Sequence, residues 1–227
     1  KDVAEYSIVG GNPARLIRDR RQKSKKDKTE LNVIEIGEKA RDQYKAILEA
    51  NTCDTPDGKI YQDPQQNGKP SVRAWCDAIE VARFFDDVPA LEDRESLINR
   101  LQSYQEDVYG LILSPGNKAP ERKDLANLPE SYHFLAVGYA LECLGSQVKN
   151  EIKAISELSA DEIYSHLESR DWVEGGWGCG AWVDHYTTGM YHNLKYHDTN
   201  NRPEDMFGGL NTRGTPATGM GGPPSHN

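Results

Sequence analysis

The chain has 227 residues, with 27 Lys or Arg against 36 Asp or Glu and a net charge of −9. This acidic balance argues against nucleic acid as a main partner. No stretch approaches 18 consecutive apolar residues, which argues against a membrane span, and no signal peptide is visible, so we expect a cytoplasmic protein. The four cysteines lie far apart without a CxxC pair, so no zinc knuckle is expected.

The first twenty residues predict a short strand followed by a tight turn. Residues 6–9 (YSIV) have strand composition, and residues 10–13 (GGNP) are strong turn formers. From Ala14 we expect a helix or a tail. Residues 21–31 are rich in Lys and Arg and show no apolar periodicity, so they predict a basic linker.

From residue 32 the pattern becomes helical, with long loops at residues 51–70 and 114–130. The first helix is marked by apolar residues at helical spacing: Val33, Ile36, Ala40, Tyr44, Ile47 and Leu48. Ser71 is placed to cap a second helix. The expected buried stripe of that helix is Trp75, Ile79, Ala82 and Phe85.

Capping signals divide the second half of the chain into further helices. One helix begins at Ser131 and closes at Gly145, and Ser159 with Glu162 forms a capping box for another. Residues 171–180 (DWVEGGWGCG) predict a loop, followed by a helix over 181–196. The fold class is therefore mainly α, as helical hairpins of an incomplete (α/α) toroid with a short β/turn piece at the N-terminus. A plain helical bundle is the alternative.

The segment from 171 to 197 is the main candidate site. It holds three of the four Trp, of which Trp177 and Trp182 lie in a glycine-rich stretch, a setting suited to stacking against sugar rings. We expect Tyr186 and His192 to help bind the substrate. Glu174 and Asp184 are the candidate carboxylates for glycoside chemistry, which needs a pair, and His185 is the third candidate catalytic residue. Two alternatives stay open: these aromatic residues and histidines form part of the core, or, less favoured, the histidines bind a metal.

The N-terminal stretch DVAEYSIVGGNPARLIRDR resembles the end of a hexapeptide-repeat, left-handed β-helix acyltransferase. The resemblance implies that residues 1–20 are the terminal piece of such a domain. It further implies that the turn and its basic flank contact acetyl-CoA or another acyl-CoA. The positions concerned are Gly10, Gly11, Asn12, Pro13, Ala14 and Arg18. The family's catalytic His and its coils are expected upstream, in a longer bacterial parent protein for which the resemblance implies a homotrimer.

Residues 71–220 resemble the (α/α)-toroid domains of bacterial carbohydrate-active hydrolases and lyases. Here helices such as HFLAVGYALECLGS alternate with aromatic, glycine-rich loops. This resemblance implies a helical domain over 32–227, truncated, with a carbohydrate substrate. Together the two resemblances imply a fragment of an acyltransferase fused to a helical domain of polysaccharide or cell-surface glycan metabolism. The alternatives are a hydrolase or lyase in its own right, or a non-catalytic carbohydrate-binding or scaffold module.

Overall fold

The computed structural model describes residues 7–10, 15–19, 32–62 and 70–197. The chain separates into two compact units, residues 1–39 and 40–227, and each is described by itself. The basic linker predicted at 21–31 lies outside the described residues.

The first unit contains a β hairpin and the beginning of a helix. Strand β1 (Ser7–Gly10) pairs antiparallel with β2 (Arg15–Asp19), with an irregular register between Ile8 and Val9. The strand at residues 6–9 is thus confirmed to within a residue, but a second strand stands where a helix or a tail was expected after Ala14. Helix α1 (Val33–Ala50) begins in this unit and ends in the second.

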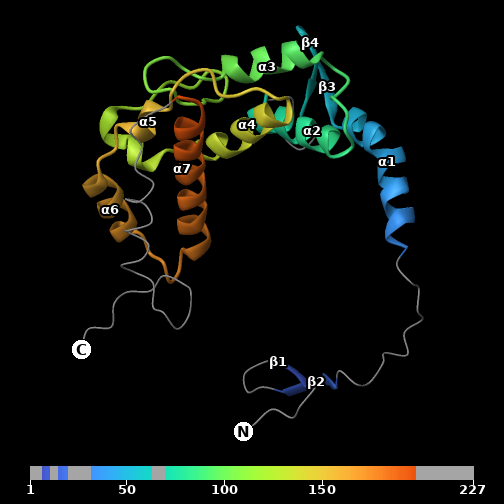
Figure 1. Ribbon diagram of the computed structural model, residues 1–227, viewed down its shortest axis with the longest axis horizontal. Helices are drawn as coiled ribbons and strands as arrows, with labels where there is room; N and C mark the ends of the chain where they lie inside the picture. Colours follow the sequence, from blue (N-terminus) through green and yellow to red (C-terminus); the bar gives the residue numbers. More distant parts are fainter. Residues whose placement is uncertain (1–6, 11–14, 20–31, 63–69, 198–227) are drawn as a thin grey trace. The chain divides into compact units, whose positions relative to one another are not determined.

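The second unit is built from helices with one further hairpin (Figure 1). In chain order after α1, its elements are β3 (Thr52–Thr55), β4 (Gly58–Tyr61), α2 (Val72–Phe84), α3 (Arg94–Ser103), the 3-10 helix η2 (Arg122–Asn127), α4 (Tyr132–Cys143), α5 (Lys153–Ser156), α6 (Ala160–Ser169) and α7 (Gly176–Tyr196). The mainly α class with a short β piece is confirmed, while the assignment to an incomplete toroid stays a prediction. None of the described helices is both long and apolar enough to cross a membrane.

Helix α4 is the centre of the core, and it packs against α2 and α7 (Figure 1). The predicted stripe of α2 is confirmed at Trp75, Ile79 and Ala82, all buried, because these residues recur at helical spacing on one face of the helix. Phe85 lies just past the end of α2 and is only partly buried, stacked on Tyr44 with ring centroids 4.4 Å apart.

The predicted helix ends are confirmed at three positions, and one differs. Ser71 accepts a hydrogen bond from the Ala74 backbone N–H at 3.4 Å, and Ser159 forms the full capping box. Gly145 follows α4 with φ +65°, a left-handed conformation that favours glycine. Ser131 precedes α4 but does not cap it, because its own backbone is helical and its side chain makes no capping bond.

Two glycines allow helices to pack closely in the core, Gly138 of α4 against α7 and Gly189 of α7 against α5. A Cβ built on Gly138 would lie 2.7 Å from both Cδ2 and Cε1 of His192, and closer still to Nε2. A Cβ on Gly189 of α7 would collide with the side chain of Ile155 in α5. Helices α4 and α7 therefore meet at a distance that a larger side chain at Gly138 would prevent.

Three segments differ from the sequence-based expectations. The loop predicted at 51–70 contains the β3–β4 hairpin, and the loop at 114–130 contains η2. The largest difference is that α7 begins at Gly176, five residues before the expected start, so that most of the predicted loop's glycines are helical.

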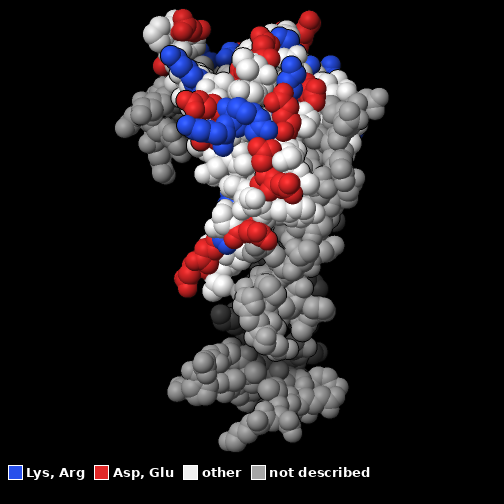
Figure 2. Space-filling view, turned by 90° about the vertical axis from the view of Figure 1, so that its left-hand side faces the viewer, with Lys and Arg blue, Asp and Glu red and all other residues white. Residues whose placement is uncertain are grey.

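Charged side chains of opposite sign are interspersed on the face drawn in Figure 2. Ion pairs of the second unit include Arg122 with Glu162 and Lys123 with Glu121, each at 2.9 Å. Exposed pairs of this kind contribute at most about 1 kcal/mol each. On this face the described charges balance locally instead of forming a patch of one sign.

Candidate functional site

The early start of α7 decides how its tryptophans are arranged. In an α-helix each residue turns by about 100°, so five residues separate two side chains by about 140°. Trp177 and Trp182 therefore lie on different faces: the side chain of Trp177 is 94% exposed, whereas that of Trp182 is 4% exposed. The expectation that both rings stack against a sugar is therefore wrong for Trp182, which is buried.

Trp182 and Tyr186 form part of the core. The two rings stack with centroids 4.3 Å apart, and the Trp182 indole donates a hydrogen bond to the Ala126 carbonyl at 3.0 Å. The Tyr186 hydroxyl donates to the Leu125 carbonyl, and burial raises the pKa of this phenol to about 12. These two side chains hold η2 against α7, so the structure places them in a packing role and not on a surface open to a sugar.

His192 is also buried, at the contact between α7 and α4. Its ring packs against Gly138, and its Nδ1 atom has no hydrogen-bond partner among the described residues. Burial lowers the pKa of His192, which keeps the imidazole neutral. A substrate-binding role for His192 is therefore not supported by its position.

His185 forms a pair that the sequence analysis did not identify. Its Nδ1 lies 3.1 Å from the Ser131 hydroxyl oxygen, and its ring contacts Tyr132 edge to face. Burial lowers the pKa of His185, while the nearby charge of Asp184 opposes this shift. Ser131 is 6% exposed and His185 is partly buried, so the pair is only partly shielded from solvent. A serine just before a helix is ordinarily a cap, and no local pattern reveals a partner 54 residues away.

The two candidate carboxylates are exposed but are not brought together with the aromatic residues in a cleft. Glu174 precedes α7, and its backbone N–H donates to the Asp171 carboxylate at 3.0 Å. Asp184 lies two turns inside α7. Of the predicted site residues, Trp177, Glu174 and Asp184 remain available to a ligand from solvent.

The exposed side of α7 carries a row of four residues, which we call the α7 outer face: Trp177, Asp184, Thr188 and Tyr191. Spacings of seven, eleven and fourteen residues place all four within about 40° of Trp177 around the helix axis. Trp177 and Asp184 are separated by about 10 Å along the axis, at about 1.5 Å per residue. The row is thus a continuous outer surface with an aromatic ring toward each end.

The far end of the α7 outer face is held in place by α4. Lys195 donates a hydrogen bond to the Glu142 carboxylate at 3.0 Å, and Tyr191 donates to the same oxygen at 3.1 Å. The Lys195 ammonium also lies 4.9 Å from the centre of the Tyr191 ring. Burial opposes the shift, yet hydrogen bonds from Tyr196, Lys195 and Tyr191 together lower the pKa of Glu142. The position of Tyr191 is therefore fixed before any ligand arrives.

The candidate acyl-CoA residues lie at the β1–β2 hairpin. Gly10 ends β1 opposite Arg15, and Arg18 lies in β2 opposite Ile8. Gly11, Asn12, Pro13 and Ala14 lie outside the described residues. The turn expected at 10–13 therefore lies largely outside the described residues, and the acyl-CoA contact stays a prediction.

The described residues contain no group of three or more His, Cys, Asp or Glu side chains that could hold a metal ion.

Comparisons of the chain with protein-family models, with curated proteins and with solved structures found no match.

Proposed function

We propose that the helical unit, residues 40–227, is a carbohydrate-binding module and that sugars bind to its α7 outer face. The observation that carries this proposal is the exposure of Trp177, whose side chain is 94% accessible at the start of α7. A large aromatic ring is usually at least partly buried, and one left in water offers a flat apolar surface to a ligand.

The surroundings of Trp177 favour a flat ligand such as a pyranose ring. A Cβ built on Gly176, Gly178 or Gly180 would meet nothing within 4 Å, so the space beside the indole is open. Asp184 and Thr188 follow on the same side of the helix and supply hydrogen-bonding groups for sugar hydroxyls. Glu174, which is exposed and precedes Trp177 in the chain, supplies a further hydrogen-bonding group.

A binding module is better supported than a hydrolase or lyase. Trp182, Tyr186 and His192 are buried in packing contacts, and the partly buried His185 is paired with Ser131. Glycoside hydrolysis needs two carboxyl groups roughly 5–9.5 Å apart on either side of the scissile bond. Glu174 and Asp184 are both exposed, and the buried aromatic side chains cannot flank a sugar held between them.

The binding proposal is tested by titrating the chain with neutral and acidic oligosaccharides while acrylamide quenches tryptophan fluorescence. Of the four tryptophans, Trp75 and Trp182 are buried and Trp172 is partly buried, so acrylamide reports mainly on Trp177. Bound sugar should protect Trp177, and Trp177→Ala should weaken binding by about tenfold or more. Trp177→Phe should retain part of the affinity.

The matched control is Val173→Ala, because Val173 is a second exposed apolar side chain in the same segment. This variant should bind sugar as the unchanged chain does. Equal affinity of Trp177→Ala and the unchanged chain, or no binding to any sugar of the panel, would reject the proposal. Turnover of any glycan that is lost in Glu174→Gln or Asp184→Asn, with binding retained, would instead favour the hydrolase or lyase.

The acyltransferase part of the proposal rests on the resemblance of residues 1–20. We propose that the parent protein transfers an acyl group from acetyl-CoA or another acyl-CoA to the glycan that the helical unit holds. Polysaccharides that bind the α7 outer face should then be acylated by the full-length protein. Trp177→Ala should raise the glycan KM of that reaction and leave the KM for acyl-CoA unchanged.

A further inference from the structure

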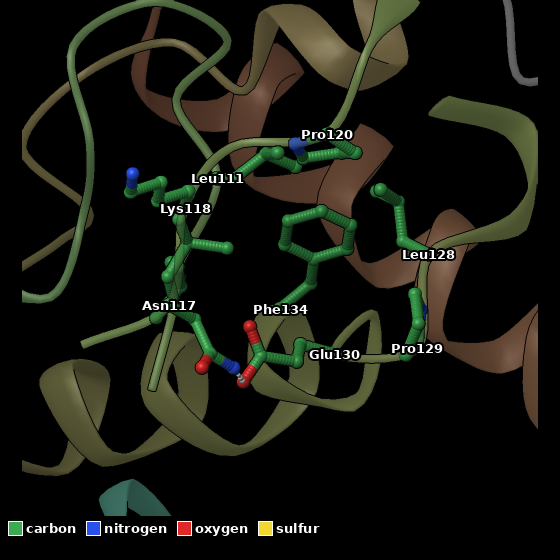
Figure 3. Close-up of a pocket in the computed structure, with 10 residues that line it drawn as sticks. Leu111, Asn117, Lys118, Pro120, Leu128, Pro129, Glu130 and Phe134 are labelled. Atoms are coloured by element: carbon green, nitrogen blue, oxygen red, sulfur yellow. Dashed lines mark hydrogen bonds between the residues drawn. The ribbon is translucent and has the colours of Figure 1, made fainter. Parts of the chain in front are cut away.

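A cavity of about 230 Å³ lies beside the start of α4, in a part of the second unit that the α7 outer face does not include (Figure 3). The loop from 111 to 120 forms one side, and the residues between η2 and α4 form the other. Its lining residues are Leu111, Ile112, Leu113, Asn117, Lys118, Pro120, Leu128, Pro129, Glu130 and Phe134. Most of this wall is apolar, so the few polar atoms in it decide what can bind.

The carboxylate of Glu130 is hydrogen-bonded to the loop that forms one side of the cavity. Its Oε1 atom accepts two hydrogen bonds at 3.0 Å, from the Ser114 backbone N–H and from the Asn117 side-chain amide. The Asn117 backbone N–H in turn donates to the Ser114 carbonyl at 3.0 Å, which closes a turn. Gly116 has φ +88° in this turn, a conformation that favours glycine. The position of the carboxylate is therefore fixed by the loop.

The other carboxylate oxygen, Oε2, accepts no hydrogen bond and forms no ion pair with a described residue. Figure 3 shows the oxygen without a dashed bond directed toward the ring of Phe134, on the cavity side. The nearest cation in the wall is Lys118, and Figure 3 shows its side chain extending away from that ring. The negatively charged Oε2 atom therefore faces a largely apolar space, and no described residue donates a hydrogen bond to it.

We propose that this cavity binds a small apolar amine. The hydrocarbon part lies among the apolar side chains of the wall, and the ammonium donates to Oε2 of Glu130. Such a charge-assisted hydrogen bond is about twice as strong as one between neutral groups, and it is strengthened by apolar surroundings.

The volume sets the size of the ligand. A dry cavity of about 150 Å³ in another protein holds benzene. The present cavity of about 230 Å³ therefore accommodates one six-membered ring with a short chain. An arylalkylamine with a two-carbon chain has this size and carries its ammonium at one end, and we choose it as the probe.

Calorimetry with three probes of one shape tests this assignment: 2-phenylethylamine, 2-phenylethanol and 3-phenylpropionate. In the unchanged chain the amine should bind about tenfold or more tightly than the alcohol, and the carboxylate should bind weakest. Equal binding of the three probes, binding that favours the carboxylate, or no binding of the amine would overturn the proposal without any variant.

Glu130→Gln tests the role of the charge. The carbonyl oxygen of the introduced amide can still accept from Ser114 and Asn117, so the loop should keep its form. The variant should lose about tenfold in affinity for the amine and keep its affinity for the alcohol, which also reports that the cavity is intact. Amine binding that is unchanged in Glu130→Gln while alcohol binding persists would overturn the proposal.

Two control variants separate this site from others. Glu121→Gln removes an exposed carboxylate of the same loop region, one that pairs with Lys123, and should leave amine binding unchanged. Trp177→Ala should also leave it unchanged, so that a failure of sugar binding and a failure of amine binding are distinguishable. Loss of amine binding in Glu121→Gln equal to that in Glu130→Gln would show general attraction of a cation to an acidic chain and would reject the cavity site.

Discussion

The closest contact between α4 and α7 makes Gly138→Ala the most informative single substitution. The added methyl would lie 2.7 Å from Cδ2 and Cε1 of His192, closer than real side chains allow, and closer still to Nε2. The imidazole cannot withdraw easily, because it is buried and one of its faces stacks on Tyr196 with ring centroids 6.0 Å apart. Either the ring or the whole helix has to move.

Two effects of opposite sign set the size of the change. Replacing glycine by alanine inside a helix stabilises it by about 0.5–1 kcal/mol, whereas overpacking a core costs about 1–3 kcal/mol. We expect overpacking to dominate and the free energy of unfolding to fall by about 1–2 kcal/mol. For a chain of this size the midpoint of thermal unfolding then falls by roughly 2–8 °C.

The assay is thermal and urea unfolding followed by circular dichroism, with Gly180→Ala of α7 as the matched control. A Cβ on Gly180 meets nothing within 4 Å, so this variant should be stabilised by a few tenths to about 1 kcal/mol. His192→Ala should remove the collision, so Gly138→Ala should no longer destabilise in that background. Equal stability of Gly138→Ala and Gly180→Ala, or no coupling between Gly138 and His192, would refute the reasoning.

Two further predictions concern the core around α7. Burial lowers the pKa of His192, and burial together with the charge of Arg170 lowers the pKa of His166 to about 4. Both histidines therefore stay neutral in the folded chain, whereas in the unfolded chain they bind protons below about pH 6.5. The urea midpoint should therefore fall as the pH drops from about 6.5 toward 4, and His166→Gln should flatten that slope; a midpoint that is constant over this range would contradict the assignment. Tyr186→Phe leaves the Leu125 carbonyl without its buried donor and should cost about 1–3 kcal/mol in urea unfolding, whereas a stability equal to that of the unchanged chain would show that water replaces the hydroxyl.

Local signals in the sequence predict those parts of the fold that local physics decides. Ser71 and Ser159 cap helices because each hydroxyl lies three residues before an unpaired backbone N–H, and this arrangement is visible in the sequence itself. The buried stripe of α2 follows from the spacing of Trp75 and Ile79. Such features require no knowledge of what lies on the other side of the core.

The candidate site was harder to predict because it depends on where one helix begins. Glycine is a poor helix former, and a run such as GGWGCG is typical of a loop. In the structure most of these glycines are helical, with the Cys179 backbone N–H bonded to the Gly175 carbonyl at 3.0 Å. A loop leaves the directions of Trp177 and Trp182 open, whereas a helix sends them to different faces. The pairs Ser131–His185 and Gly138–His192 depend on long-range packing that no local pattern encodes.

The glycines at the start of α7 connect the fold to the proposed function. Gly176, Gly178 and Gly180 each lower the stability of the helix by about 1 kcal/mol relative to alanine. Packing does not require them, because a Cβ at each would meet nothing within 4 Å, and none has the positive φ that favours glycine. The fold therefore tolerates a weak first turn that alanine would strengthen at no steric cost. Because glycine has no side chain, these positions leave open space near the exposed ring of Trp177. A ligand that lies flat on that ring would occupy this space.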